Sequence, residues 1–180
     1  MIELETNRLV MRPWRPADLD GIAEIFGQEE TAQYIGGLCS RDEAWRRMAT
    51  VVGHWTLRGF GLWVLEEKSS GAFVGSSGLW YPEGWPEMEA GWWVLPAKQK
   101  QGYATEAARR ARLYAYQVLG ASTLVSYIHP NNKPSQRVAE RLGAHFEKKI
   151  ELRGVPACVY RHPSAQQILA QEVITSAASS

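Results

Sequence analysis

Cysteine is scarce in this sequence: Cys39 and Cys158 are the only two among 180 residues. They lie far apart along the chain, and neither has a His or another Cys nearby at the spacing of metal ligands. The usual patterns of a zinc site and of a disulfide framework are therefore both missing. We expect two free thiols and no bound metal.

Long apolar runs are missing too. No stretch approaches the roughly 18 to 20 apolar residues that a membrane-spanning helix needs. The first residues, Met1-Ile2-Glu3-Leu4-Glu5, do not show the basic and then apolar pattern of a secretory signal. These observations predict no membrane partner and favour the cytoplasm as the location.

An excess of one charge is the third absence. The chain carries 20 Lys and Arg against 19 Asp and Glu, a formal charge of +1, and the basic residues are spread along its length. Nucleic-acid-binding surfaces concentrate positive charge on one face because they neutralise phosphates. We expect no direct contact with nucleic acid, which still leaves open an RNA-associated protein as a partner.

What the chain does have is an ordinary share of core-forming residues. Hydrophobic residues make up 45% of the 180, which fits one globular domain and leaves no room for a second full one. Apolar periodicity predicts strands and helices along its length. The expected strands cover residues 4–14, 60–66, 72–81, 87–95, 122–129, 145–152 and 155–161.

The expected helices alternate with these strands. One follows Asp18, and the others cover residues 40–57, 105–119 and 135–142. Ser40 and Glu43 are spaced for a capping box. This alternation predicts a mixed α/β sheet with helices on both faces. Beyond Pro163 the apolar residues leave open a short amphipathic helix or a mobile tail; they are Ile168, Leu169, Val173 and Ile174.

The stretch from Glu89 to Thr105 is suited to holding an anion. An apolar strand runs into a basic turn with one glycine, and the turn opens a helix. N–H groups of a first helical turn lack intrahelical partners and lie at the positive end of the helix dipole, so they bind pyrophosphate. Gly102 permits close approach of a phosphate, and Lys98 and Lys100 add positive charge.

Four segments resemble the GNAT superfamily of N-acyltransferases, in the expected order over roughly residues 4 to 160. Gln99-x-x-Gly102-x-Ala104 is similar to the acetyl-CoA pyrophosphate loop, which reads Arg or Gln, two residues, Gly, one residue, Gly or Ala. The other three segments resemble the branch that includes the ribosomal-protein N-terminal acetyltransferases. They are the opening Leu4 to Trp14 with Asp18-Leu19, the third strand Val74 to Leu79, and the second cofactor motif Asn132-Lys133-Pro134-Ser135 with Glu140-Arg141-Leu142-Gly143.

The resemblance implies one GNAT-like domain over residues 1–162, followed by a tail at 163–180. It implies a central, mostly antiparallel sheet that splays between the strand ending near Leu95 and the strand starting near Ser122. The pantetheine arm of acetyl-CoA, the co-substrate, would lie in that split. Dimers are common in the superfamily, so a homodimer is left open.

Acyl transfer to an amine needs a base, because an alkyl ammonium group has a pKa of about 10. Glu89 is the candidate, since it lies on the strand entering the turn and matches a Glu proposed as base in some relatives. Glu87 competes because strand alternation points both side chains to the same face. The alternative for Glu89 is an ordinary solvent-facing strand carboxylate.

The departing thiolate needs a proton. Many superfamily members place a tyrosine seven residues after the motif asparagine, but here Ala139 follows Asn132 at that distance. Ser135 matches the serine that the ribosomal-protein-type branch offers near the cofactor sulfur, and Asn132 resembles the residue that holds the pantetheine chain. Ser135 would equally suit a helix cap, and the two roles are compatible.

The expected cofactor site combines these motifs. A backbone N–H of residues 92–94 would stabilise the oxyanion where the splayed strand lacks a partner. Trp92 and Trp93 are expected to act as packing groups or pocket walls. The residues expected to bind acetyl-CoA are Trp93, Val94, Gln99, Lys100, Gln101, Gly102, Tyr103, Ala104, Thr105, Asn132 and Ser135.

The expected activity is N-acetylation of a primary amine by acetyl-CoA, through direct attack in a ternary complex. Aromatic residues such as Trp80, Tyr81 and Trp85 indicate a partly apolar pocket mouth, and nearby acidic residues suit a cationic amine. A protein N-terminus, a peptide and a small-molecule amine all fit. The alternatives are a non-catalytic module that binds or senses acyl-CoA, and an interaction protein in which the turn is purely structural.

Overall fold

The computed structural model describes residues 2–177, with side chains as far as Gln171. Its strands form one sheet in the order β1-β2-β3-β4-β5-β6-β8-β7. β5 and β6 run parallel and share one residue pair, and the other neighbours are antiparallel. The strands are β1 (Leu4–Glu5), β2 (Leu9–Arg12), β3 (Leu62–Glu67), β4 (Phe73–Trp80), β5 (Glu89–Val94), β6 (Val125–Ile128), β7 (His145–Leu152) and β8 (Val155–Arg161).

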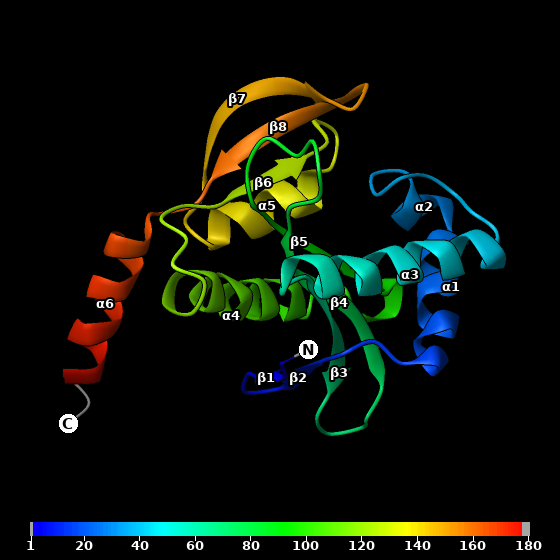
Figure 1. Ribbon diagram of the computed structural model, residues 1–180, viewed down its shortest axis with the longest axis horizontal. Helices are drawn as coiled ribbons and strands as arrows, with labels where there is room; N and C mark the ends of the chain where they lie inside the picture. The colour runs from blue at the N-terminus through cyan, green and yellow to red at the C-terminus, as the bar shows by residue number, and fades with distance from the viewer. Residues whose placement is uncertain (1, 178–180) are drawn as a thin grey trace.

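Helices cover both faces of this sheet, as expected (Figure 1). They are α1 (Leu19–Phe26), α2 (Glu29–Ala32), α3 (Arg41–Arg58), α4 (Tyr103–Gln117), α5 (Lys133–Arg141) and α6 (Ala165–Ala177), with short 3₁₀ turns at Pro16–Asp18 and Pro96–Lys98. Two successive tryptophans of β5 mark the two faces, because strand side chains alternate. Trp93 contacts Phe26 of α1, whereas Trp92 packs against a cluster that includes Ala139 of α5.

The buried apolar residues form two clusters that meet at β5. The larger one joins β2 to β5 with α1, α3 and α4, and includes Trp63, Val64 and Leu65 at no measurable exposure. The smaller one lies under β6, β8 and α5 and is closed by Trp92. The division between the two clusters follows the line along which β5 and β6 part.

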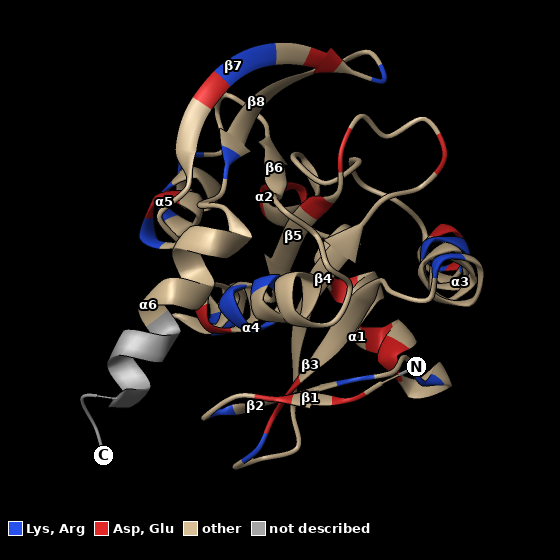
Figure 2. Ribbon diagram, turned by 60° about the vertical axis from the view of Figure 1, so that its left-hand side comes forward, with Lys and Arg blue, Asp and Glu red and all other residues tan. Residues whose placement is uncertain are grey.

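β7 is the last strand of the sheet, on the side of the smaller cluster. Charged residues follow one another along it (Figure 2): Glu147, Lys148, Lys149 and Glu151. Charges on an edge strand discourage pairing with another chain, since the exposed N–H and C=O groups would otherwise be a template. The strand is thus suited to remain an edge.

The expectation of one strand over residues 4–14 is wrong in detail. A turn at Thr6 to Arg8 separates β1 from β2. Its polar groups are held by Glu106 of α4, which accepts from the Thr6 hydroxyl at 2.6 Å and from the Arg8 N–H at 2.9 Å. Asp18, the residue after which the first helix was expected, is buried, and the Arg12 guanidinium donates to both of its oxygens at 2.9 and 2.7 Å.

Helix ends are set by caps. Ser40 caps α3 by accepting the Glu43 N–H, as expected. Asn132, and not Ser135, caps α5: its side chain accepts the Ser135 N–H at 3.2 Å, so the helix begins two residues earlier than expected.

The C-terminal segment forms α6. Ile168 is buried and Leu169 packs against the larger core, while the side chains of Val173 and Ile174 lie outside what the structure describes. The Tyr116 hydroxyl donates to the carbonyl of Pro163 at 2.7 Å and ties the start of this segment to α4. Within residues 2–177, no helix combines the length and the apolar character that a membrane crossing requires.

Candidate active site

The site lies where β5 and β6 part. The two strands pair at Glu89 and Val125 and then diverge, which confirms the predicted splay of the sheet. Along its other edge, β5 stays paired with β4 as far as Val94. Since N–H groups alternate sides along a strand and the Leu95 N–H bonds to Val74, the N–H of Trp93 points to β4. Those of Trp92 and Val94 point into the split.

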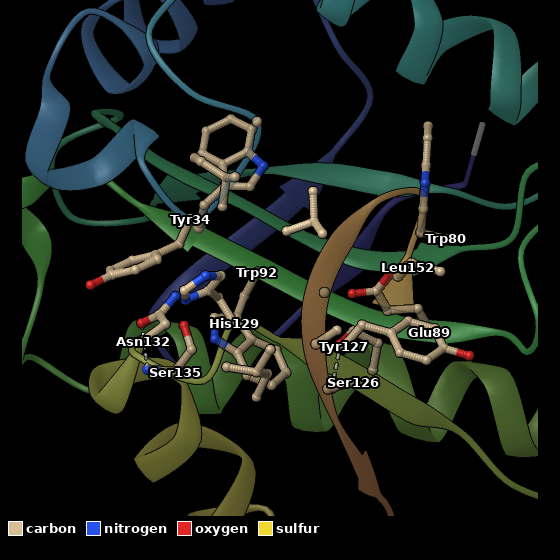
Figure 3. A pocket seen from close by; sticks show the side chains of 18 of the residues that line it. Tyr34, Trp80, Glu89, Trp92, Ser126, Tyr127, His129, Asn132, Ser135 and Leu152 are labelled. Atoms are coloured by element: carbon tan, nitrogen blue, oxygen red, sulfur yellow. Dashed lines mark hydrogen bonds between the residues drawn. The ribbon is translucent and has the colours of Figure 1, made fainter. Parts of the chain in front are cut away.

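Between the diverging strands lies a pocket of about 420 Å³. Figure 3 shows Asn132, Ser135 and Tyr34 at one end and Glu89, Trp80 and Leu152 at the other. The first group comes from the N-cap and first turn of α5 and from the segment after α2, and the second comes from β4, β5 and the β7–β8 hairpin. The pocket therefore joins the predicted cofactor motif to the predicted base.

Glu89 is the carboxylate of this pocket. The Trp85 indole donates to its Oε2 at 2.9 Å, and the backbone amide of Tyr127 also hydrogen-bonds it. Removal from water outweighs these bonds and raises the pKa of Glu89 to about 7. A carboxylate with such a pKa both accepts and releases a proton near neutral pH, which is the property that a general base requires.

Glu87 is not a comparable base. It precedes β5, and the Arg161 guanidinium donates to both of its carboxylate oxygens, at 2.5 and 2.8 Å. These hydrogen bonds lower the pKa of Glu87, so its lone pairs are committed to Arg161. The strand alternation that put Glu87 beside Glu89 does not extend beyond the start of β5.

Ser135 lines the same pocket and lies half-buried in the first turn of α5. Its N–H is used by the Asn132 cap, while its hydroxyl has no hydrogen-bond partner among the described residues. His129 lies beside them and packs against the Tyr34 ring at 5.3 Å. His54 of α3 is buried outside the pocket lining, and both of its ring nitrogens are hydrogen-bonded.

The turn before α4 has the conformation that anion binding requires. Gly102 is the N-cap with φ of 86°, and Lys100 has φ of 60°, both in the left-handed region. Within the described chain, no acceptor meets the N–H groups of Gln101 to Thr105. A consecutive row of unpaired N–H groups at a helix N-terminus fits the pyrophosphate of acetyl-CoA.

Two side chains of the turn are committed elsewhere. Lys98, expected to add charge for the phosphates, donates to Glu67 at 2.9 Å. The buried Tyr103 side chain also donates its hydroxyl to Glu67. Hydrogen bonds from Ser70, Tyr103 and Lys98 together lower the pKa of Glu67 to about 2. Lys98 is therefore part of a neutralised cluster, and Lys100 is the exposed cation of the turn.

Arg8 contacts the turn before α4 through its guanidinium group. No sequence motif had assigned a role to this residue. It donates to the carbonyl of Gln101 at 2.9 Å, pairs with Glu106 at 2.6 Å and stacks over Tyr103 at 4.4 Å. Because Arg8 holds the Gln101 carbonyl and the Tyr103 ring, it restrains the backbone of the turn whose N–H groups have no acceptor within the described chain. The sequence offered one indirect signal, since Arg8 lies in the family-like opening segment.

We expect Arg8→Gln to raise the KM for acetyl-CoA about three- to tenfold with little change in kcat, because the turn loses a support that acts on cofactor binding alone. Steady-state kinetics with varied acetyl-CoA measures this split. Arg41→Gln is the matched control, since Arg41 forms an exposed pair with Asp20. Equal effects of the two variants would contradict the bracing role.

A serine and a histidine behind β5 were also not found from the sequence. The Ser126 hydroxyl donates to the carbonyl of Ala90 at 2.6 Å, across the junction of β6 and β5. His162 Nε2 lies 3.0 Å from the Oγ of Ser126. Burial lowers the pKa of His162 to about 3, so the ring is neutral and Nε2–H donates to Ser126. This contact fixes the point from which the strands diverge.

A mixed sheet split between parallel strands, with an anion-binding helix start beside the split, defines an acyl-CoA-dependent acyltransferase. A family model described as Acetyltransferase (GNAT) domain matches residues 8–145. The chain belongs to this family, whose acyl donor is acetyl-CoA.

Individual relatives agree with this assignment. The chain is 31% identical to the uncharacterized protein YkkB of Bacillus subtilis over 90% of this chain and 96% of that protein. The acetyltransferase from Agrobacterium tumefaciens str. C58 is 29% identical, with a TM-score of 0.83 over 91% of this chain and 95% of that one. RimL, a ribosomal L7/L12 α-N-protein acetyltransferase solved with coenzyme A, is 14% identical with a TM-score of 0.73 over 89% and 97%, and shows the fold alone.

Proposed function

We propose that this acetyltransferase acts on a primary amine, with Glu89 as the general base in a ternary complex. The observation that carries the proposal is a single pocket carboxylate whose pKa lies at about 7, at the point where the strands part. A base with that pKa is half ionised at neutral pH and takes a proton from an ammonium group, which frees the nitrogen lone pair for attack.

The proton balance assigns a role to each end of the pocket. Attack by the neutral amine forms a C–N bond and breaks the C–S bond of the thioester. Two protons must move: one leaves the ammonium group before attack and passes to solvent, and one passes from the nitrogen to the thiolate afterwards. Glu89 would take the first. Ser135 is the candidate for delivering the second, because its hydroxyl lies at the opposite end beside Asn132 and has no partner among the described residues.

Backbone groups would supply the remaining stabilisation. The N–H groups of Trp92 and Val94 face the split and are candidates for the oxyanion contact, since such donors stabilise charge as it develops on the carbonyl oxygen. The turn from Gln99 to Thr105 would hold the pyrophosphate, and Asn132 the pantetheine chain. The cytoplasm stays a prediction from the sequence.

Initial-velocity kinetics tests the proposal. Free thiol released from acetyl-CoA is followed with a colorimetric thiol reagent while amine and acetyl-CoA are both varied, and mass spectrometry identifies the acetylated product. Direct transfer gives intersecting double-reciprocal lines. Parallel lines would indicate an acetyl-enzyme and overturn the ternary-complex proposal. Binding of acetyl-CoA without thiol release against any amine would instead favour the sensing module.

A further inference from the structure

The end of the pocket around Glu89 is walled by aromatic rings in fixed positions. Trp80 of β4 stacks on His54 with ring centroids 4.4 Å apart and planes inclined by 20°. His54 is itself held, because its Nδ1 lies 2.8 Å from the carbonyl of Phe60 and its Nε2 accepts the Tyr81 N–H at 3.0 Å. Trp80 therefore cannot swing away without breaking a buried arrangement, and it presents a rigid wall to the pocket.

A second tryptophan of the pocket lining is held by its own set of contacts. The Trp85 indole is anchored to Glu89 by its hydrogen bond and packs edge-on against Tyr127, with centroids 6.3 Å apart. Burial raises the pKa of Tyr127 to about 12, so its hydroxyl stays neutral. Rigid aromatic walls favour a flat apolar ligand, because no rotamer freedom is lost when it binds.

Charge at this end is sparse. Of the described residues that line the pocket, Glu89 is the only carboxylate, and Arg153 on the exposed β7–β8 turn is the only Lys or Arg. The other carboxylates of the 80–88 loop lie outside the lining: Glu83 is 99% exposed, and Glu87 is held by Arg161. One ammonium group finds a partner here, and a second one does not.

Partners for neutral polar groups are equally few. The Trp85 N–H is used by Glu89, and the Ser126 hydroxyl is used by Ala90 and His162. The Tyr127 hydroxyl is the exception, since it is buried and has no partner among the described residues. The pocket has a volume of about 420 Å³, so this end holds only a small amine or the amine-bearing end of a larger molecule.

We propose that the natural acceptor is a small primary monoamine with an apolar, ring-bearing body, whose ammonium group meets Glu89 while its body lies against Trp80 and Trp85. This inference rests on the proposed function. It disfavours polyamines, because no second carboxylate is found among the described residues that line the pocket.

A substrate panel on the unaltered enzyme gives the first test. We expect kcat/KM for phenethylamine and tryptamine to exceed the values for putrescine and for a tripeptide with a free α-amine by at least about tenfold. The reverse order would overturn this inference while leaving amine acetylation intact. Failure to acetylate any of the four, with acetyl-CoA binding preserved, would overturn both the inference and the proposed function.

Variants at the wall give the second test. We expect Trp80→Ala to lower kcat/KM for phenethylamine roughly tenfold and for ethylamine less than about threefold, because the small amine does not reach the ring wall. Trp45→Ala is the matched control, since Trp45 is 55% exposed on α3 and lies outside the pocket. A preserved thermal shift by acetyl-CoA establishes that each variant is folded. Equal loss for both amines would contradict the proposed contact.

Discussion

Glu89→Gln is expected to lower kcat roughly 10²- to 10⁴-fold while the KM for acetyl-CoA stays nearly unchanged. The amide keeps the size of the side chain and still accepts the Trp85 hydrogen bond, but it takes no proton. Free-thiol release in the presence of an amine measures the effect. Glu87→Gln is the control, because Glu87 is a neighbouring carboxylate engaged by Arg161, and a loss of similar size there would refute the assignment of the base.

The pH profile separates this role from a structural one. A base works when deprotonated, so kcat for the unaltered enzyme should rise as pH increases through about 7, the pKa of Glu89, and then level off. Glu89→Gln should lose that inflection. Tyr127 titrates at about 12, well above this range.

Stability should move in the opposite direction to activity. The folded-state pKa of Glu89, about 7, lies above its unfolded value of about 4.3, so the group favours folding below the lower value. That contribution is lost as pH rises through about 7. Gln suffers no such loss, and Glu89→Gln should melt no lower than the unaltered protein at mildly alkaline pH. An inactive variant that melts lower there would point to damage rather than a missing base.

Gly102→Val is expected to abolish the stabilisation that acetyl-CoA gives the protein. Gly102 has φ of 86°, which a β-branched residue avoids, and a Cβ there would lie 3.4 Å from Arg8 Nη2. To relieve the strain, the turn must rotate the N–H groups that face outward. In the unaltered protein, ligand at about a hundred times its Kd adds roughly 2.7 kcal/mol of stability. Thermal unfolding with and without acetyl-CoA reads out the difference.

Gly120→Val is the matched control for that substitution. Gly120 has φ of 70°, and a Cβ there would meet nothing within 4 Å, so the two variants share a backbone penalty of similar kind. Gly120 follows the far end of α4, away from the turn. Gly120→Val should lower the melting temperature and keep the full increase in melting temperature that acetyl-CoA causes. A retained shift in Gly102→Val would show that the turn does not hold the cofactor.

Local sequence signals predicted much of the fold. The bounds of β7 and β8 agree with the expectation, because Arg153-Gly154 is a strong turn between two alternating segments, and both residues have positive φ. Ser40 indicated the start of α3, because its side chain is of the kind that caps a helix N-terminus. The break between β1 and β2 was missed because its stabilising partner, Glu106, lies about a hundred residues away.

The site divides in the same way. The turn before α4, Asn132 and the split of the sheet came from short motifs and from the resemblance they carry. The pKa of Glu89, the commitment of Glu87 to Arg161 and the neutralisation of Lys98 by Glu67 depend on neighbours from other elements. Sequence spacing carries no information on such contacts between distant elements. The sequence therefore indicated which residues are charged, but not which of those charges are already paired.

The alternation of N–H groups along β5 has a consequence for isotope exchange. Leu95 and Trp93 donate toward β4, so their amide hydrogens are shielded as in any sheet, whereas Trp92 and Val94 face the split. Neighbouring residues of one central strand should therefore exchange with deuterated solvent at very different rates. Bound acetyl-CoA would slow the fast pair and leave the slow ones as they were, so that a two-residue periodicity in deuterium uptake would trace the catalytic edge of the strand.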